Sequence, residues 1–254
     1  MREPKKALLF KSISIRTILP NVVTLFAFMA GLTSIKFALS GKWEWSVAAV
    51  ILAGIFDGLD GTVARLLKST SKFGAELDSL SDVVAFGVAP AVILYLWVLH
   101  DLDRLGWAVA LIYAIAMALR LARFNAKIDD ASDPRKRFGF LTGVPAPMGA
   151  GLLLMPMMIE FGVGDGTASS NGLLISFYSV CIALLMVSTI PTISLKALRV
   201  PKEWFVPVML VIGIIIAGLF VRTWIVFMLI GMLYIVSMPL TYWAFKKRLA
   251  SKKR

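Results

Sequence analysis

The sequence predicts an all-α membrane protein, a polytopic helical bundle of about eight transmembrane helices. Of the 254 residues, 59% are hydrophobic, and they occur in long uninterrupted runs. A run of roughly 20 apolar residues is long enough to cross a bilayer as an α-helix, whereas soluble domains rarely contain one. Lys and Arg collect in the segments between these runs, which supports the same division into helices.

The predicted spans follow the apolar runs in order. They cover residues 18–39, 44–66, 81–99, 105–124, 143–162, 171–191, 204–221 and 224–244. An even number of spans puts both ends of the chain on one side, and 23 of the 27 Lys and Arg residues then lie on that side. The four others are Lys36, Lys42, Arg104 and Arg222. Because Lys and Arg are enriched in cytoplasmic loops, we expect both termini in the cytoplasm.

Residues 1–254 are predicted to form a single integral membrane domain. Residues 1–16 precede the first span, residues 17–162 carry the first five spans, and residues 163–254 add three more. The segment Lys5–Arg16 alternates basic and apolar residues, so we expect it to lie on the cytoplasmic membrane surface as an interfacial helix. The net charge of +12 is interpreted as attraction to an anionic leaflet, and no nucleic-acid partner is expected.

The chain has one cysteine and one histidine, which excludes several classes of site. Cys181 lies within a predicted span and cannot form an intramolecular disulfide. His100 lies on the predicted outward side, so neither Ser-His-Asp catalysis nor a His-rich metal site is expected on the cytoplasmic face. The sequence also lacks the Gly-rich loop and Lys of a P-loop, which argues against ATP-driven phosphoryl transfer.

Four aspartates lie where the chain is otherwise apolar, and ionisable residues within spans usually have a function. Asp57 and Asp60 are three residues apart near the cytoplasmic end of the second span, so they share one helical face. Asp78 and Asp82 are four apart after a short polar turn and share a face in the same way. Carboxylate oxygens suit Mg²⁺ or Mn²⁺, and we predict two such ions that bridge a pyrophosphate.

Small and basic residues share the face of the first aspartate pair. Gly61, Ala64 and Arg65 follow at helical spacing. The small residues leave room for a bulky ligand, and Arg65 offers a planar guanidinium suited to phosphate. Glu76 lies near the turn and is interpreted as a solvated or capping carboxylate. We expect a site that is open to the cytoplasm, because Asp57 lies roughly 13 Å from the end of its helix.

These residues form the motif Asp-x2-Asp-Gly-x2-Ala-Arg-x8-Gly-x3-Asp-x3-Asp, which runs from Asp57 to Asp82. The motif resembles the signature of the CDP-alcohol phosphotransferases at every fixed position. Within that family the chain is most similar to the membrane-bound phosphatidylserine synthases, the CDP-diacylglycerol–serine O-phosphatidyltransferases. The resemblance covers about residues 17–160, and the last three helices are too generic in sequence to add to it. The similarity to the phosphatidylserine synthases in particular rests on residues 81–90, 120–125 and 143–147.

The resemblance implies roles for the motif residues. Asp57, Asp60 and Asp78 would bind two divalent cations, and Asp82 would lie near the metal and act as the base. The residues implied to bind CDP-diacylglycerol are Asn21, Thr24, Gly61, Ala64, Arg65, Ser71 and Gly74. The resemblance also implies a homodimer in the cytoplasmic membrane, with its active site facing the cytoplasm.

Arg120, Arg123 and Asn125 are candidates for binding the acceptor alcohol. They lie at the cytoplasmic end of the fourth span, where they could grip a carboxylate or a phosphate. The two arginines could equally well serve only to anchor the cytoplasmic end of the span, as Lys and Arg commonly do. Only the resemblance favours the acceptor role.

The predicted reaction is metal-dependent transfer of a phosphatidyl group from CDP-diacylglycerol to the hydroxyl of L-serine, which gives phosphatidylserine and CMP. The same chemistry with glycerol 3-phosphate or inositol phosphate is an alternative, because the four aspartates would serve each of these acceptors. A divalent-cation transporter is a more remote alternative, since intramembrane acids also mark ion pathways. The transporter is less favoured because all four acids cluster toward the cytoplasmic half.

Overall fold

The computed structural model describes residues 15–69, 71–126, 140–164, 166, 169–193 and 201–251. The interfacial helix predicted for Lys5–Arg16 falls almost wholly outside these residues. Its last two residues, Ile15 and Arg16, belong to the first helix of the bundle.

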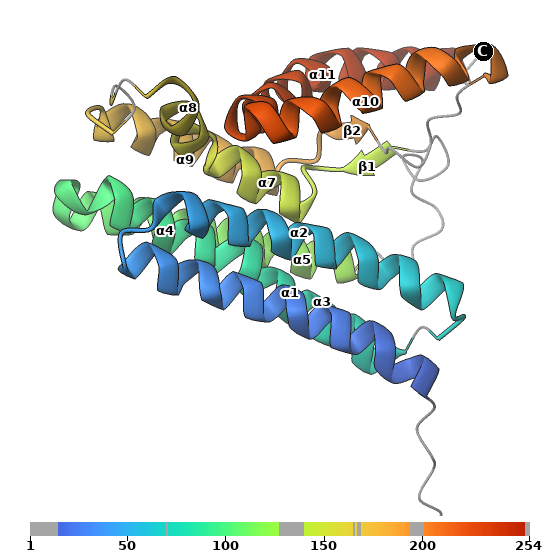
Figure 1. Cartoon of the computed structure of the whole chain (residues 1–254), viewed down its shortest axis with the longest axis horizontal. Coiled ribbons are helices and arrows are strands. Elements are labelled where there is room, and N and C mark those ends of the chain that lie inside the picture. The colour runs from blue at the N-terminus through green and yellow to red at the C-terminus, as the bar shows by residue number, and fades with distance from the viewer. Residues whose placement is uncertain are drawn as a thin grey trace, which may run out of the picture.

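Most of the described residues are helical, and the long helices run roughly parallel to one another (Figure 1). The first group comprises α1 (Ile15–Leu39), α2 (Trp43–Leu66), α3 (Lys72–Asp82), a π-helix (Val83–Val88), α4 (Ala89–Trp97), a 3₁₀ turn (Leu99–Leu102) and α5 (Asp103–Ala126). The second comprises α7 (Ala146–Leu153), α8 (Met155–Val163), α9 (Gly172–Val187), a 3₁₀ turn (Lys202–Trp204), α10 (Phe205–Val221) and α11 (Thr223–Ser251). Two short strands, β1 (Phe140–Thr142) and β2 (Pro191–Ile193), pair antiparallel.

Five helical segments of the described chain are long and apolar enough to cross a membrane. They are Ile18–Leu39, Trp43–Leu66, Lys72–Trp97, Leu99–Ala126 and Thr223–Trp243. The pair α7 and α8 makes a sixth candidate if the two helices count as one bent span, and α9 and α10 are apolar but shorter. The all-helical architecture with several candidate spans is confirmed, while the count of eight stays a prediction.

The third span begins earlier than the sequence predicted. Ser71 caps α3 by accepting a hydrogen bond from the Gly74 amide at 3.0 Å, so the helix starts at Lys72 rather than near residue 81. It then continues through the π-helix into α4. In the π-helix the Ala89 amide bonds to the Val84 carbonyl five residues earlier, and the Tyr113 hydroxyl of α5 donates to the Phe86 carbonyl at 3.0 Å.

The fifth predicted span is bent by 49° where α7 meets α8. Pro156 stands at the start of α8 and has no amide hydrogen for the Leu152 carbonyl. The Tyr178 hydroxyl of α9 donates to this carbonyl at 2.5 Å. The bend therefore has a local cause, and the Leu152 carbonyl beside it accepts from the Leu154 amide as well as from this tyrosine.

The first group of helices holds the aspartates. The most extensive helix pair is α1 with α2, and α1 also packs against α3, the π-helix and α4. A Cβ on Gly31 of α1 would lie 2.7 Å from the Cα of Ala85, so glycine permits this close approach. α5 joins the two groups by packing on the π-helix and α9, and α11 packs on α8 and β2.

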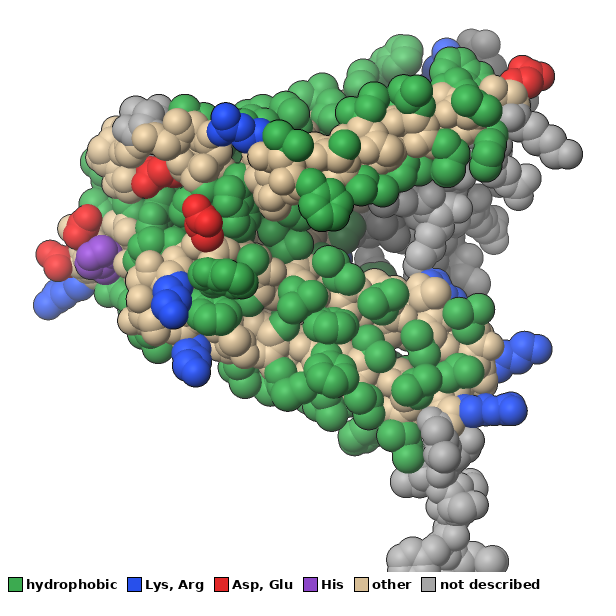
Figure 2. Space-filling view, viewed as in Figure 1, with side chains coloured by type: hydrophobic (Ala, Val, Ile, Leu, Met, Phe, Trp, Pro, Cys, Tyr) green, Lys and Arg blue, Asp and Glu red, His purple; other side chains and the backbone are tan. Residues whose placement is uncertain are grey.

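The surface is apolar along the length of the bundle. Figure 2 shows hydrophobic side chains over the middle of the visible face and charged side chains toward its two ends. None of the residues of α10, all of which the structure describes, is buried. This distribution is expected of helices surrounded by lipid. The start of α1, the α2–α3 turn and the end of α11 lie at the same end of the molecule, on the right in Figure 1.

Candidate active site

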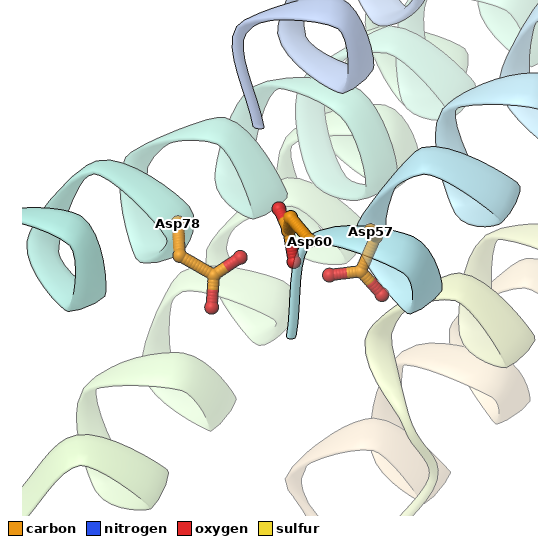
Figure 3. A group of neighbouring side chains, drawn as sticks. All are labelled: Asp57, Asp60 and Asp78. Carbon is orange, nitrogen blue, oxygen red and sulfur yellow. The ribbon is translucent and has the colours of Figure 1, made fainter. Parts of the chain in front are cut away.

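Three aspartates meet between α2 and α3. Asp57, Asp60 and Asp78 each offer a carboxylate oxygen, and these oxygens all lie within 4.8 Å of one another. Figure 3 shows Asp57 and Asp60 on α2 with Asp78 facing them from α3. Asp60 is only 5% exposed, and the other two are half-buried. Carboxylates this close repel one another unless a cation or a proton lies between them, so this all-oxygen group could bind Mg²⁺ or Mn²⁺.

Asp82 lies outside this group of three carboxylates. It is the last residue of α3 and is half-buried. Its side chain is within hydrogen-bond reach of Asp57, and the charges of Asp78 and Arg120 also act on it. The fourth aspartate of the motif therefore lies at the edge of the carboxylate group, beside a cation from α5.

Thr24 of α1 holds the most buried of the three carboxylates. Its hydroxyl lies 2.6 Å from Asp60 Oδ2 and 3.1 Å from the Pro20 carbonyl oxygen. Ser81, which the sequence did not single out, donates to the Thr24 carbonyl at 3.3 Å and links α3 to α1 next to Asp82. Hydrogen bonds of this kind orient a carboxylate that binds metal. The family resemblance implied that Thr24 binds CDP-diacylglycerol, and this role stays a prediction.

An open cavity of about 180 Å³ lies beside the carboxylates, lined by residues of α1, α2, α3 and the α2–α3 turn. Six of the seven residues predicted to bind CDP-diacylglycerol line it together with Asp60 and Asp78, namely Asn21, Thr24, Gly61, Ala64, Ser71 and Gly74. The seventh, Arg65, is not among the lining residues; it is exposed, and its Nη2 lies 3.3 Å from Thr62 Oγ1. The predicted lipid-binding residues thus gather on one cavity, apart from Arg65.

Ser69 also lines the cavity, although the sequence did not point to it. Its Oγ atom is enclosed and has no hydrogen-bond partner among the described residues. Buried hydroxyls nearly always have a partner, and a polar group bound in the cavity would supply one. Ser69 lies in the turn after α2, outside both helical faces, so no periodic pattern could have revealed it.

Gly61 and Gly58 form a matched pair that can test the cavity. A Cβ on either residue would meet no protein atom within 4 Å, but only Gly61 lines the cavity. Both Gly→Ala changes should raise helix stability by about 0.5–1 kcal/mol. We expect Gly61→Ala to raise the KM for the ligand of the cavity, CDP-diacylglycerol on the predicted function, by roughly tenfold. Steady-state kinetics should find that Gly58→Ala leaves this KM unchanged. Equal KM values in the two variants would contradict the proposal that the ligand binds in the cavity.

The three candidate acceptor residues have protein partners. Arg120 Nε donates to the Val144 carbonyl, Arg123 donates to the carbonyls of Val187 and Ser188, and Asn125 Nδ2 donates to Ser79 Oγ at 2.8 Å. Arg123 therefore satisfies carbonyl groups at the end of α9, where the helix leaves them without partners. Of the three, Arg120 is the one whose charge acts on Asp82.

Comparison with known proteins gives the family. Residues 17–164, which contain the whole aspartate motif, match the family described as CDP-alcohol phosphatidyltransferase. The chain belongs to this family. Residues 203–239, within and around α10 and α11, match a family described as CDP-alcohol phosphatidyltransferase 2. The family likeness therefore extends into helices whose sequence had suggested no resemblance.

Several relatives carry the name CDP-diacylglycerol–serine O-phosphatidyltransferase. The one from Mycobacterium tuberculosis is 38% identical over 222 residues, which are 87% of this chain and 77% of the relative. The relative from Helicobacter pylori is 37% identical over 196 residues, which are 77% of this chain and 80% of the relative. The relative from Methanocaldococcus jannaschii is 39% identical over 183 residues, which are 70% of this chain and 75% of the relative. The predicted family is confirmed, and these relatives belong to the predicted branch.

Proposed function

We propose that this phosphatidyltransferase moves the phosphatidyl group of CDP-diacylglycerol to the hydroxyl of L-serine and releases CMP. The observation that carries the proposal is the group of three carboxylates beside a cavity lined by residues of the family motif. The name shared by the relatives supports serine as the acceptor.

The reaction forms a bond between the serine oxygen and the phosphorus that carries diacylglycerol, and it breaks the bond from this phosphorus to the CMP oxygen. The serine hydroxyl must lose its proton as it attacks. We assign this proton to Asp82, a carboxylate that is next to the group of three without belonging to it.

Asp57, Asp60 and Asp78 are proposed to hold two Mg²⁺ or Mn²⁺ ions, with Asp82 at their edge. Bound divalent cations would neutralise the negative charge that develops on the pyrophosphate as its bond breaks. Thr24 would keep Asp60 in position, while Asn21, Ser69 and Ser71 offer hydrogen bonds to the CDP group. The short α2–α3 turn keeps the carboxylates of the two helices close to one another.

On the acceptor side we propose Arg120, Arg123 and Asn125. Arg120 is the best candidate for direct contact, because among the described residues its guanidinium bonds only through Nε, to the Val144 carbonyl. Arg123 and Asn125 would help to position the acceptor site by bonding the end of α5 to α9 and α3.

The choice of acceptor can be tested directly. Purified protein would be supplied with CDP-diacylglycerol, Mn²⁺ and one alcohol at a time, and CMP release would be measured. We expect release with L-serine and little with glycerol 3-phosphate or inositol phosphate. Release that does not depend on serine would contradict the proposed acceptor, and uptake of metal into proteoliposomes without any lipid product would support a transporter instead.

We also propose a single membrane domain of eight spans, in which α7–α8, α9 and α10 each cross, with both termini and the active site facing the cytoplasm. The topology can be tested with single cysteines in a Cys181→Ala background, because Lys42 and Lys72 are exposed at opposite ends of α1–α3. In intact cells an impermeant maleimide should label Lys42→Cys, and it should label Lys72→Cys only after the membrane is opened. The reverse pattern would contradict this orientation.

A homodimer is the assembly that the family resemblance favours. Light scattering of the detergent-solubilised protein, corrected for bound detergent, should give twice the chain mass of 27.8 kDa. A mass equal to one chain would contradict it.

A further inference from the structure

Helix α11 brings an enclosed hydroxyl to the surroundings of Arg120. The Oη atom of Tyr234 is buried and has no hydrogen-bond partner of normal geometry in the described part of the chain. Thr192 of β2 and Arg120 of α5 are near enough to interact with it. The packing of α11 against β2 fixes this position.

The other two enclosed tyrosine hydroxyls have clear structural partners. Tyr113 donates to the Phe86 carbonyl and Tyr178 donates to the Leu152 carbonyl. A buried hydroxyl without a partner costs about 1–3 kcal/mol. Phenylalanine would avoid this cost at position 234, so the hydroxyl of Tyr234 is better explained by a ligand than by packing.

The groups around this hydroxyl are mainly donors. Thr192 Oγ1 already donates its proton to the Gly143 carbonyl at 2.7 Å. Arg120 uses Nε for the Val144 carbonyl, which leaves its terminal nitrogens as donors. Arg120 also acts on Asp82, the proposed base. Arg120 and Thr192 bond to the carbonyls of neighbouring residues, Val144 and Gly143, and α11 packs on the strand that carries Thr192, so the phenol and the guanidinium lie in the same region. Two such donors suit an anionic group of the acceptor.

We propose that Tyr234 binds the acceptor, and that its hydroxyl and the Arg120 guanidinium together hold the carboxylate of an amino-acid alcohol. This inference rests on the proposed function and adds a residue from outside the aspartate motif. It also gives a role to the α10–α11 segment, which has its own family match. In this arrangement α11 selects the acceptor, while α2 and α3 carry out the transfer.

The test is Tyr234→Phe, which removes one oxygen atom and keeps the ring. We expect the KM for L-serine to rise about tenfold, with kcat and the KM for CDP-diacylglycerol within twofold of the unmodified protein. The preference for L-serine over ethanolamine, which has no carboxylate, should fall by a similar factor. The melting temperature in detergent should stay equal or rise, because the lost hydroxyl makes no hydrogen bond of normal geometry within the described residues.

Tyr178→Phe is the matched control, since it removes a buried hydroxyl that is bonded within the protein. It should lower the melting temperature and leave the KM for L-serine unchanged. An unchanged serine KM in Tyr234→Phe, an equal loss with serine and ethanolamine, or a lower melting temperature would each overturn the inference. If the unmodified protein releases no CMP in response to serine, the proposed function itself fails, which is a separate result.

Discussion

Replacing Asp60 with asparagine is expected to slow transfer of the phosphatidyl group by roughly 10³-fold or more, a barrier increase of about 4 kcal/mol. Asp60 is the most buried member of the carboxylate group and the one held by Thr24. An amide of the same shape can keep the hydrogen bond but is a much weaker ligand for a hard divalent cation. The measurement is the initial rate of CMP release at saturating Mn²⁺.

The same variant should lose the thermal stabilisation that Mn²⁺ gives, because a ligand that binds only the folded state raises its melting temperature. Without metal, Asp60→Asn should be as stable as the unmodified protein, since removing one of three close carboxylates relieves repulsion. Glu76→Gln is the matched control, as it removes an exposed carboxylate two residues from Asp78. If both variants respond to Mn²⁺ equally, the metal assignment is wrong.

Asp82→Asn is expected to slow turnover by roughly 10²–10⁴-fold, the usual contribution of a general base. Unlike Asp60, Asp82 lies outside the group of three carboxylates. Most of the stabilisation by Mn²⁺ and the affinity for CDP-diacylglycerol should therefore survive in this variant. The measurements are the single-turnover rate and the melting temperature with and without Mn²⁺.

The two aspartate variants separate metal binding from proton transfer. Retained turnover in Asp82→Asn would exclude Asp82 as the base. Complete loss of the Mn²⁺ effect in Asp82→Asn would instead make Asp82 a principal metal ligand, which its position at the edge of the group does not favour.

The sequence predicted the carboxylate group well because helical periodicity is local. Asp57 and Asp60 share a face of α2 at a spacing of three, and the short turn to α3 leaves little freedom for where Asp78 can lie. Gly61 and Ala64 of the cavity lining follow from the same α2 face, whereas Asn21, Thr24, Ser71 and Gly74 were expected only from the family resemblance. Arg65 differs because it lies in the last turn of α2, where its side chain is exposed and does not line the cavity.

Contacts between residues far apart in the sequence could not be predicted in this way. The Thr24–Asp60 bond spans 36 residues, and the Arg123–Ser188 bond spans 65. Charge patterning assigned Arg123 to a membrane anchor or an acceptor site, but nothing in the pattern shows that the carbonyls at the end of α9 need a donor. The pairing of β1 with β2 likewise depends on two distant segments.

The helix boundaries were missed for physical reasons. The segment Lys72–Asp82 carries several polar residues, so its low hydropathy hid the start of the third span until the Ser71 cap was known. The bend between α7 and α8 occurs within one apolar run, where hydropathy is uniform. Pro156 was the local signal for it.

Following the oxygen atom of serine tests the central claim most directly. Purified protein would be given CDP-diacylglycerol, Mn²⁺ and L-serine labelled with ¹⁸O in its hydroxyl, and both products would be examined by mass spectrometry. Direct attack by the hydroxyl at phosphorus predicts labelled phosphatidylserine and unlabelled CMP in equal amounts. Unlabelled phosphatidylserine, or CMP formed without it, would contradict the account.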